Sequence, residues 1–145
     1  MIVQRLLDNI PFFWTFTEEE KERLLGLDCY FQTFQSGDYL IHEEAEDNAL
    51  FIILKGTAKV TKKSHPDRVI TILEPGTVFG EIAFLTQRPR STDVVANEKM
   101  ICFTINGETM AQLDSQMQHK IKDQLIEILV QRLDQMNQTL LNLVR

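Results

Sequence analysis

Three residues in the stretch FGEIAFLTQRPRSTDVV, residues 79–95, have side-chain types and a spacing that could bind a ligand. Gly80 opens a short apolar helix, EIAFL, whose first N–H groups lack intrahelical acceptors and therefore favour an anion. Glu81 places a carboxylate, which accepts hydrogen bonds, beside those donors, and Arg90 adds a guanidinium that can pair with two phosphate oxygens. The Glu81 carboxylate can accept from a hydroxyl, and the Arg90 guanidinium and the backbone N–H groups can bind an anion. Together these groups fit a ribose phosphate.

Two neighbouring features bear on how these groups are held. Gly80 has no Cβ, so we expect a ligand to approach its backbone closely. Pro89 fixes its own φ and biases Arg88 away from the helical region, which would hold Arg90 in place. The alternative is a surface turn in which Glu81 and Arg90 form an incidental ion pair, because such pairs are common and weak.

The composition limits the class of protein. A length of 145 residues fits one domain, and 43% hydrophobic residues allow a packed core. The net charge of −6 argues against a nucleic-acid-binding protein, which usually has a basic face. The segment MIVQRLLDNI shows no signal peptide and no apolar run approaches a membrane span, so a cytoplasmic location is expected. Cys29 and Cys102 lack Cys-x-x-Cys spacing and are expected to be buried, reduced thiols.

The elements that must position these residues change in type along the chain. Residues 1–27 predict two short helices, the second with Thr17 as N-cap and Glu20 completing a capping box, joined by PFFWTF, whose aromatic residues should form half of a small core. Residues 28–106 hold strand-like runs spaced by about ten residues, with Gly and Pro at the turns. Residues 107–145 predict one short and one long helix. The predicted fold is mainly β with flanking helices: a double-stranded β-helix or jelly-roll-like β-roll plus a long C-terminal helix.

Two apolar stripes follow the long C-terminal helix. The first comprises Ile121, Leu125 and Ile128. The second has the 3-4-3-4-3 spacing of a heptad seam and comprises Ile126, Leu129, Leu133, Met136, Leu140 and Leu143. A helix about 45 Å long outruns a small roll, so the second stripe predicts a homodimer seam. The alternative is that both stripes pack on the same subunit.

The stretch FGEIAFLTQRPRSTDV resembles the phosphate-binding cassette of cyclic nucleotide-binding domains. The segments IPFFWTFTEEEKERL, FQSGDYLIHE, LFIILKGTAKV and ILEPGTVFGE resemble the same family, in its order. The resemblance covers essentially the whole chain. It implies that residues 1–145 form a single such domain, with N-terminal helices, a β-roll carrying the cassette at 79–94, and a C-terminal pair of hinge helices.

The resemblance also implies residue roles. Glu81 would bind the ribose 2′-hydroxyl, and Arg90 would pair with the cyclic phosphate. The other cassette and pocket residues implied are Phe79, Gly80, Ile82, Ala83, Ser91, Thr92, Ile70 and Thr71. No cofactor or metal is expected beside the nucleotide.

The long helix resembles the dimer helix of bacterial catabolite activator proteins. Aligning its Arg132-Leu133 dipeptide places Met136 and Asn137 where those proteins contact the base. Met136 also belongs to the heptad seam, which fits a base held at a dimer interface. A hydroxyl at Ser91 could favour guanine, and Asn137 could serve either purine. The interpretation favours cAMP, with cGMP as the alternative.

Three departures from the family pattern bear on binding. Asp93 stands where many members carry a small or hydroxylated residue, so its carboxylate would either point to solvent or repel the phosphate. Ala45-Glu46 replaces the usual glycine, so that turn could differ. No helix-turn-helix precedes the end at Arg145, so direct DNA binding is not expected.

Four functions compete on these observations. The favoured one is a non-catalytic cyclic-nucleotide sensor in which the ligand repositions the C-terminal helices and signals to an unidentified protein partner. The second is a degenerate domain kept as a dimerisation scaffold. The third, a cupin-like metal enzyme, needs clustered ligands, whereas His42, His65 and His119 are scattered. The fourth, a DNA-binding regulator, conflicts with the charge and the missing module.

Overall fold

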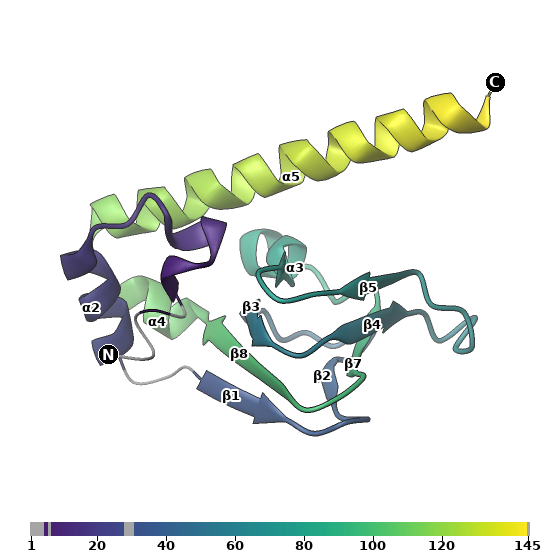
Figure 1. Ribbon diagram of the computed structural model, residues 1–145, viewed down its shortest axis with the longest axis horizontal. Coiled ribbons are helices and arrows are strands. Elements are labelled where there is room, and N and C mark those ends of the chain that lie inside the picture. Colours follow the sequence, from purple (N-terminus) through teal and green to yellow (C-terminus); the bar gives the residue numbers. More distant parts are fainter. Residues whose placement is uncertain (1–4, 6, 28–30, 145) are drawn as a thin grey trace.

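Two four-stranded antiparallel sheets form the centre of the computed structural model, which describes residues 5, 7–27 and 31–144 (Figure 1). One sheet has the order β1-β8-β3-β6 and the other β2-β7-β4-β5. The strands are β1 (Phe31–Phe34), β2 (Tyr39–Ile41), β3 (Leu50–Lys55), β4 (Ala58–Thr61), β5 (Thr71–Leu73), β6 (Val78–Phe79), β7 (Asp93–Ala96) and β8 (Met100–Ile105). The helices are η1 (Pro11–Phe13), α2 (Glu18–Gly26), α3 (Glu81–Thr86), α4 (Gly107–Gln112) and α5 (Ser115–Leu143). The predicted β-roll with flanking helices is confirmed.

Strand β3 is buried on both faces because each face has its own core. Leu50 and Ile52 face a core shared with the N-terminal helices and α5, whereas Phe51 faces a core between the two sheets. This double burial explains the unbroken apolar run LFIIL.

Cys102 of β8 lies fully buried between the sheets, and burial raises the pKa of its thiol to about 12, so the thiol stays protonated. Cys29 lies outside the described residues.

The aromatic segment around η1 supplies three of its four rings to the core. Phe12, Phe13 and Phe16 are buried, and Phe13 meets Phe103 of β8 edge-on at 5.8 Å between ring centroids. The prediction is wrong for Trp14, which is 67% exposed and donates its Nε1–H to the backbone oxygen of Asp8 at 3.0 Å. A tight 3₁₀ turn sends successive side chains in different directions, so they cannot all point inward.

Helix α2 begins as predicted and also contacts α5. Thr17 Oγ1 accepts from the Glu20 backbone N–H at 3.1 Å, and Glu20 Oε1 accepts from the Thr17 backbone N–H at 2.9 Å, which completes the capping box. Glu20 Oε1 also accepts from Lys120 Nζ of α5 at 2.5 Å. The same ammonium lies 5.9 Å from the Phe16 ring centroid. These contacts fix the first half of α5 against the N-terminal helices.

The two stripes of α5 have different surroundings. Ile121 and Leu125 are fully buried and Ile128 is partly buried against the same core, so the first stripe packs on the body as predicted. Leu129 of the second stripe is half-buried, and the rest of that stripe is exposed. Residues 129–143 of α5, called the arm below, lead away from the sheets toward the C-terminus (Figure 1). The alternative in which both stripes pack on the same subunit is therefore wrong.

Candidate functional site

The start of α3 is built around Gly80. This residue takes the left-handed φ of 83°, which costs other residues strain and suits glycine. A Cβ there would lie 2.9 Å from the backbone oxygen of Ala49 and 2.9 Å from Arg90 Nη1. The space beside Gly80 is thus filled by the chain itself. The missing Cβ thus makes room for neighbouring atoms of the chain, and close approach of a ligand to the Gly80 backbone stays a prediction.

Arg90 is buried and held by several acceptors. Its Nη2 donates to Asp47 Oδ2 at 2.9 Å and to the Ala49 backbone oxygen at 2.7 Å. Its Nη1 donates to the Gly80 backbone oxygen at 3.0 Å, and its Nε to Asp47 Oδ1 at 3.4 Å. The guanidinium N–H donors that were predicted to bind phosphate therefore already bind the Asp47 carboxylate. Sequence reasoning missed Asp47, because nothing in the acidic run EEAED distinguishes one carboxylate from the next.

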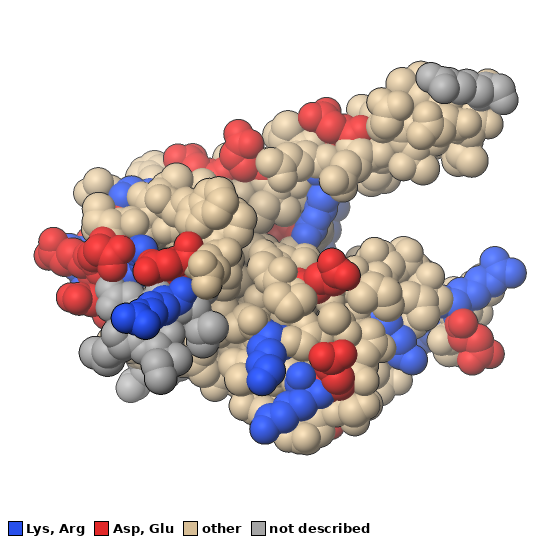
Figure 2. Space-filling view, viewed as in Figure 1, with Lys and Arg blue, Asp and Glu red and all other residues tan. Residues whose placement is uncertain are grey.

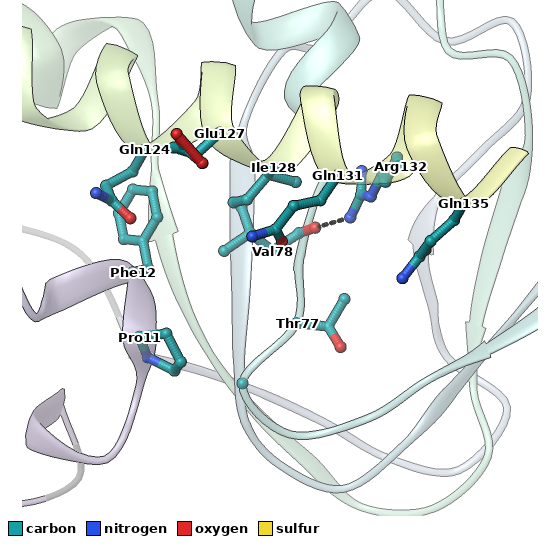
Figure 3. Close-up of a pocket in the computed structure, with 11 residues that line it drawn as sticks. Pro11, Phe12, Thr77, Val78, Gln124, Glu127, Ile128, Gln131, Arg132 and Gln135 are labelled. Atoms are coloured by element: carbon teal, nitrogen blue, oxygen red, sulfur yellow. Dashed lines mark hydrogen bonds between the residues drawn. The ribbon is translucent and has the colours of Figure 1, made fainter. Parts of the chain in front are cut away.

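Glu81 is buried and pairs with a residue of α5. Arg132 Nη1 donates to Glu81 Oε1. Arg132 Nη2 donates to the Val78 backbone oxygen (Figure 3). Glu81 and Arg90 thus have different partners, and the incidental ion pair of the surface-turn alternative is not the one that forms. Sequence reasoning missed this role of Arg132. The available signal was its position, four residues after Ile128, as a charged continuation of the inward stripe.

A cavity of about 320 Å³ lies beside this contact, between η1, the turn before β6 and α5 (Figure 3). Polar side chains of α5 line the cavity together with Pro11, Phe12 and Gly76. These polar side chains are Gln124, Glu127, Gln131, Arg132 and Gln135. The cavity is distinct from the α3 start and shares with that region only Val78 and Arg132.

The remaining residues predicted in the cassette differ in exposure. Phe79 is buried and stacks on Phe51, with centroids 5.0 Å apart and planes 7° apart, so its side chain belongs to the core. A contact between Phe79 and a ligand stays a prediction. Ala83 is also buried, whereas Ile82 is 46% exposed. The first N–H groups of a helix have no intrahelical acceptors, so those of α3 need acceptors from outside the helix.

Other predicted contacts lie on the rim or farther away. Ser91 is exposed and Thr92 is half-buried directly after Arg90. On β5 and just before it, Thr71 and Ile70 are exposed, Ile70 to 58%. Asn137 lies exposed on the arm, and within the described residues no hydrogen bond joins it to the cassette. The structure therefore does not bring Asn137 together with the other predicted residues.

Asp93 has a structural partner. Its carboxylate is buried, and Oδ1 accepts from the Glu43 backbone N–H at 2.6 Å, so the expectation that it could point to solvent is wrong. The loop that follows is paired with the cassette: the Glu44 backbone N–H donates to the Arg90 backbone oxygen at 2.7 Å, and the Arg90 N–H donates to the Ala45 oxygen at 2.8 Å. Glu44 takes a left-handed φ of 71° in this turn. Asp93 thus helps to hold the loop that carries Asp47.

The described residues give little support to the metal-enzyme alternative. Over residues 5, 7–27 and 31–144, no group of three or more His, Cys, Asp or Glu side chains is arranged to hold a metal ion. His42 instead stacks on Tyr39, with ring centroids 4.6 Å apart.

In the same ranges, none of the helices combines the length and apolar character needed to span a bilayer. Acidic side chains gather near α2 on the face shown in Figure 2.

Comparisons with known proteins agree with this geometry. A family model described as the cyclic nucleotide-binding domain matches residues 31–116. A cGMP-dependent protein kinase of Eimeria tenella is 30% identical over 116 residues, covering 80% of this chain and 11% of that protein. Human cGMP-dependent protein kinase 2 is 32% identical over 112 residues, covering 74% of this chain and 14% of that protein. The chain therefore spans only a small part of these curated relatives.

A solved structure gives the same result for the fold. The catabolite activator protein of Thermus thermophilus superposes with a TM-score of 0.77 at 22% identity, covering 92% of this chain and 63% of that one. At this identity the likeness concerns the architecture of the roll and its helices.

Proposed function

The chain belongs to the cyclic nucleotide-binding domain family, and we propose that it binds a cyclic purine nucleotide at residues 79–92 as a regulatory domain without catalysis of its own. The observation that carries this proposal is the buried Arg90 guanidinium, fixed against the Gly80 backbone oxygen at 3.0 Å beside the start of α3. A positioned guanidinium next to first-turn N–H groups suits a phosphate, because both favour negative charge.

Each part of a cyclic nucleotide has a counterpart at this site. The phosphate would lie against the first turn of α3 and the free N–H of Arg90. The ribose 2′-hydroxyl would donate to Glu81, whose carboxylate is an acceptor when ionised. The base would cover Ile70 near β5 together with Ile82 and Leu85 of α3, which are large apolar side chains left exposed.

Arg132 offers a physical route from the ligand to α5. Its guanidinium and the ribose hydroxyl would use the same Glu81 carboxylate. A ligand that takes up this carboxylate weakens the hold of Arg132 and so favours arrangements in which the arm has moved. The output is thus a change in the position of α5 relative to the roll, as the sequence led us to expect.

The choice of base is a separate proposal. The sequence interpretation favours cAMP, and that remains a prediction. The curated relatives named above are cGMP-dependent kinases, and the exposed Ser91 hydroxyl next to Arg90 could accept or donate to a guanine amino group. These two observations favour cGMP as the second candidate, and a paired titration decides between them.

We also retain the proposal of a homodimer through α5. The exposed heptad positions Ile126, Leu133 and Leu140 form an apolar stripe that water disfavours. In a parallel pair of helices, Arg132 at heptad position g would face Asn137 at position e of the second copy. This contact brings no like charges together. The scaffold alternative predicts this dimer without any nucleotide binding.

Calorimetric titration of cAMP and cGMP tests the binding proposal. The wild-type protein should release or absorb heat with at least one of them, and Arg90→Ala should not. Arg88→Ala is the matched control, because Arg88 is an exposed arginine two residues away. Arg90→Lys keeps the positive charge but lacks the planar array of N–H donors. A folded Arg90→Lys protein that no longer binds nucleotide would show that the loss is one of binding and not of folding. Absence of binding to a folded wild-type protein would favour the scaffold alternative.

A further inference from the structure

We propose that Asp47 makes the site selective for a phosphate group carrying one negative charge, and hence for a cyclic phosphodiester over a 5′-phosphomonoester. The inference rests on the proposed function, because it concerns the same site. Asp47 is not one of the predicted ligand contacts, but its side chain binds Arg90. The observations that carry it are the number of guanidinium donors already used and the charges that surround them.

Intramolecular acceptors leave Arg90 little capacity for a ligand. Asp47 accepts from Nε and Nη2, and the backbone oxygens of Ala49 and Gly80 accept from Nη2 and Nη1. Because a guanidinium has one N–H on Nε and two on each Nη, one N–H on Nη1 is left. Arg90 can therefore offer a phosphate a single hydrogen bond while Asp47 stays in place. A bidentate grip on two phosphate oxygens requires Asp47 to leave.

The charges lead to the same selectivity. Arg90 and Asp47 form one ion pair, and Arg132 and Glu81 form a second, so these side chains bring no net charge to the site. A cyclic phosphodiester adds one negative charge, whereas a phosphomonoester at neutral pH adds up to about two, because its second pKa is about 6. Arg90 and Glu81 are buried, so water screens the added charge poorly.

Asp47 is singled out from its acidic neighbours by its contacts. Glu43 is engaged elsewhere: its Oε2 accepts from the Lys63 backbone N–H at 2.7 Å, and Lys62 Nζ lies 3.5 Å from its Oε1. That backbone hydrogen bond lowers the pKa of Glu43, so this carboxylate stays ionised. Glu46 is exposed one residue before Asp47, and the described hydrogen bonds of Arg90 do not include it. Glu46 is therefore a matched control for the charge of the loop.

The test is a competition experiment in which unlabelled cGMP, cAMP, 5′-GMP and 5′-AMP displace a fluorescent cyclic nucleotide from the full chain. Wild type, Asp47→Asn and Glu46→Gln are compared at pH 7.5. Asn is isosteric with Asp and keeps an oxygen for Arg90, so the fold should survive. We expect Asp47→Asn to lower the preference for cyclic over 5′-phosphates by about tenfold. Glu46→Gln should leave the preference unchanged.

A second arm varies the charge of the ligand. At about pH 5.5, below its second pKa of about 6, a phosphomonoester carries mostly one charge, so wild type should discriminate less there than at pH 7.5. An unchanged preference in Asp47→Asn, or an equal change in Glu46→Gln, would overturn the role of Asp47 while leaving cyclic nucleotide binding intact. Equal loss of all four nucleotides in Asp47→Asn would also overturn it, because Asp47 would then only position Arg90. Failure of wild type to bind any of the four would overturn the proposed function and this inference together.

Discussion

Arg132 of α5 donates a hydrogen bond to the carboxylate of Glu81 at the start of α3, across 51 positions of sequence. The same arginine donates to the backbone oxygen of Val78 at the start of β6. This contact ties α5 to the roll beyond the point where its apolar stripe ends at Ile128. The position of the helix is thereby coupled to the residue proposed to bind the ribose.

Arg132→Ala should raise the affinity for a cyclic nucleotide by up to about fivefold, because breaking a partly exposed ion pair costs roughly 0.2–1 kcal/mol. Hydrogen exchange of the ligand-free variant should be faster in residues 128–136. Gln131→Ala is the matched control on the same helix and should change neither quantity. A lower affinity in Arg132→Ala would show that Arg132 supports the site rather than competing for it.

Gly80→Ala should destabilise the protein more than Gly76→Ala does. Both glycines have a left-handed φ, 83° and 90°, so both substitutions carry a backbone cost of roughly 1–2 kcal/mol. At Gly76 nothing lies within 4 Å of the added Cβ, whereas at Gly80 the Cβ meets Ala49 and Arg90 at 2.9 Å. The overpacking should add about 1–3 kcal/mol in urea unfolding. Equal losses at the two positions would contradict the close packing of Arg90.

The contact between Glu20 and Lys120 should make stability depend on acid. Burial alone would raise the pKa of Glu20, but hydrogen bonds from Lys120 and the Thr17 backbone outweigh it and lower that pKa below its ordinary 4.5. A lowered native pKa gives stability that is fully present above the unfolded value and is lost as the pH falls through the native one. The difference in unfolding free energy between wild type and Glu20→Gln should therefore shrink below about pH 4.5. A difference that is constant from pH 7 to pH 3 would contradict this.

Leu133→Asp should convert a dimer to a monomer in light scattering, because it places a charge on the exposed apolar stripe of the arm. Gln138→Asp adds the same charge on the opposite side of the helix and should leave the mass unchanged. A wild-type protein that is already monomeric at high concentration would refute the dimer proposal. Nucleotide binding need not change in any of these cases.

The β-roll and the inward stripe of α5 were predictable because their patterns follow from burial. Leu50 to Leu54 is apolar throughout because β3 is covered on both sides, and Ile121 and Leu125 recur at helical spacing. Glu81 and Arg90 were found through their chemical types. Their partners were not, because Asp47 and Arg132 are distant in sequence and become neighbours only when the sheets and α5 pack.

Trp14 and Asp93 show a second kind of limit. A sequence shows that Trp14 is aromatic but not which way a 3₁₀ turn directs it, and the ring is exposed. Asp93 reads as a charge near a phosphate site, yet its carboxylate accepts a backbone N–H from Glu43. In both cases the backbone group that the side chain meets decides its environment, and side-chain type alone does not reveal that partner.

The most direct test of the central claim maps amide NMR shifts while cGMP or cAMP is added to the labelled wild-type protein. We predict the largest shifts at Gly80, Glu81 and Ile82 and next to Arg90, with smaller changes near Arg132. Shifts confined to the cavity lined by Gln124 and Gln135, or no shifts at millimolar nucleotide, would contradict the account.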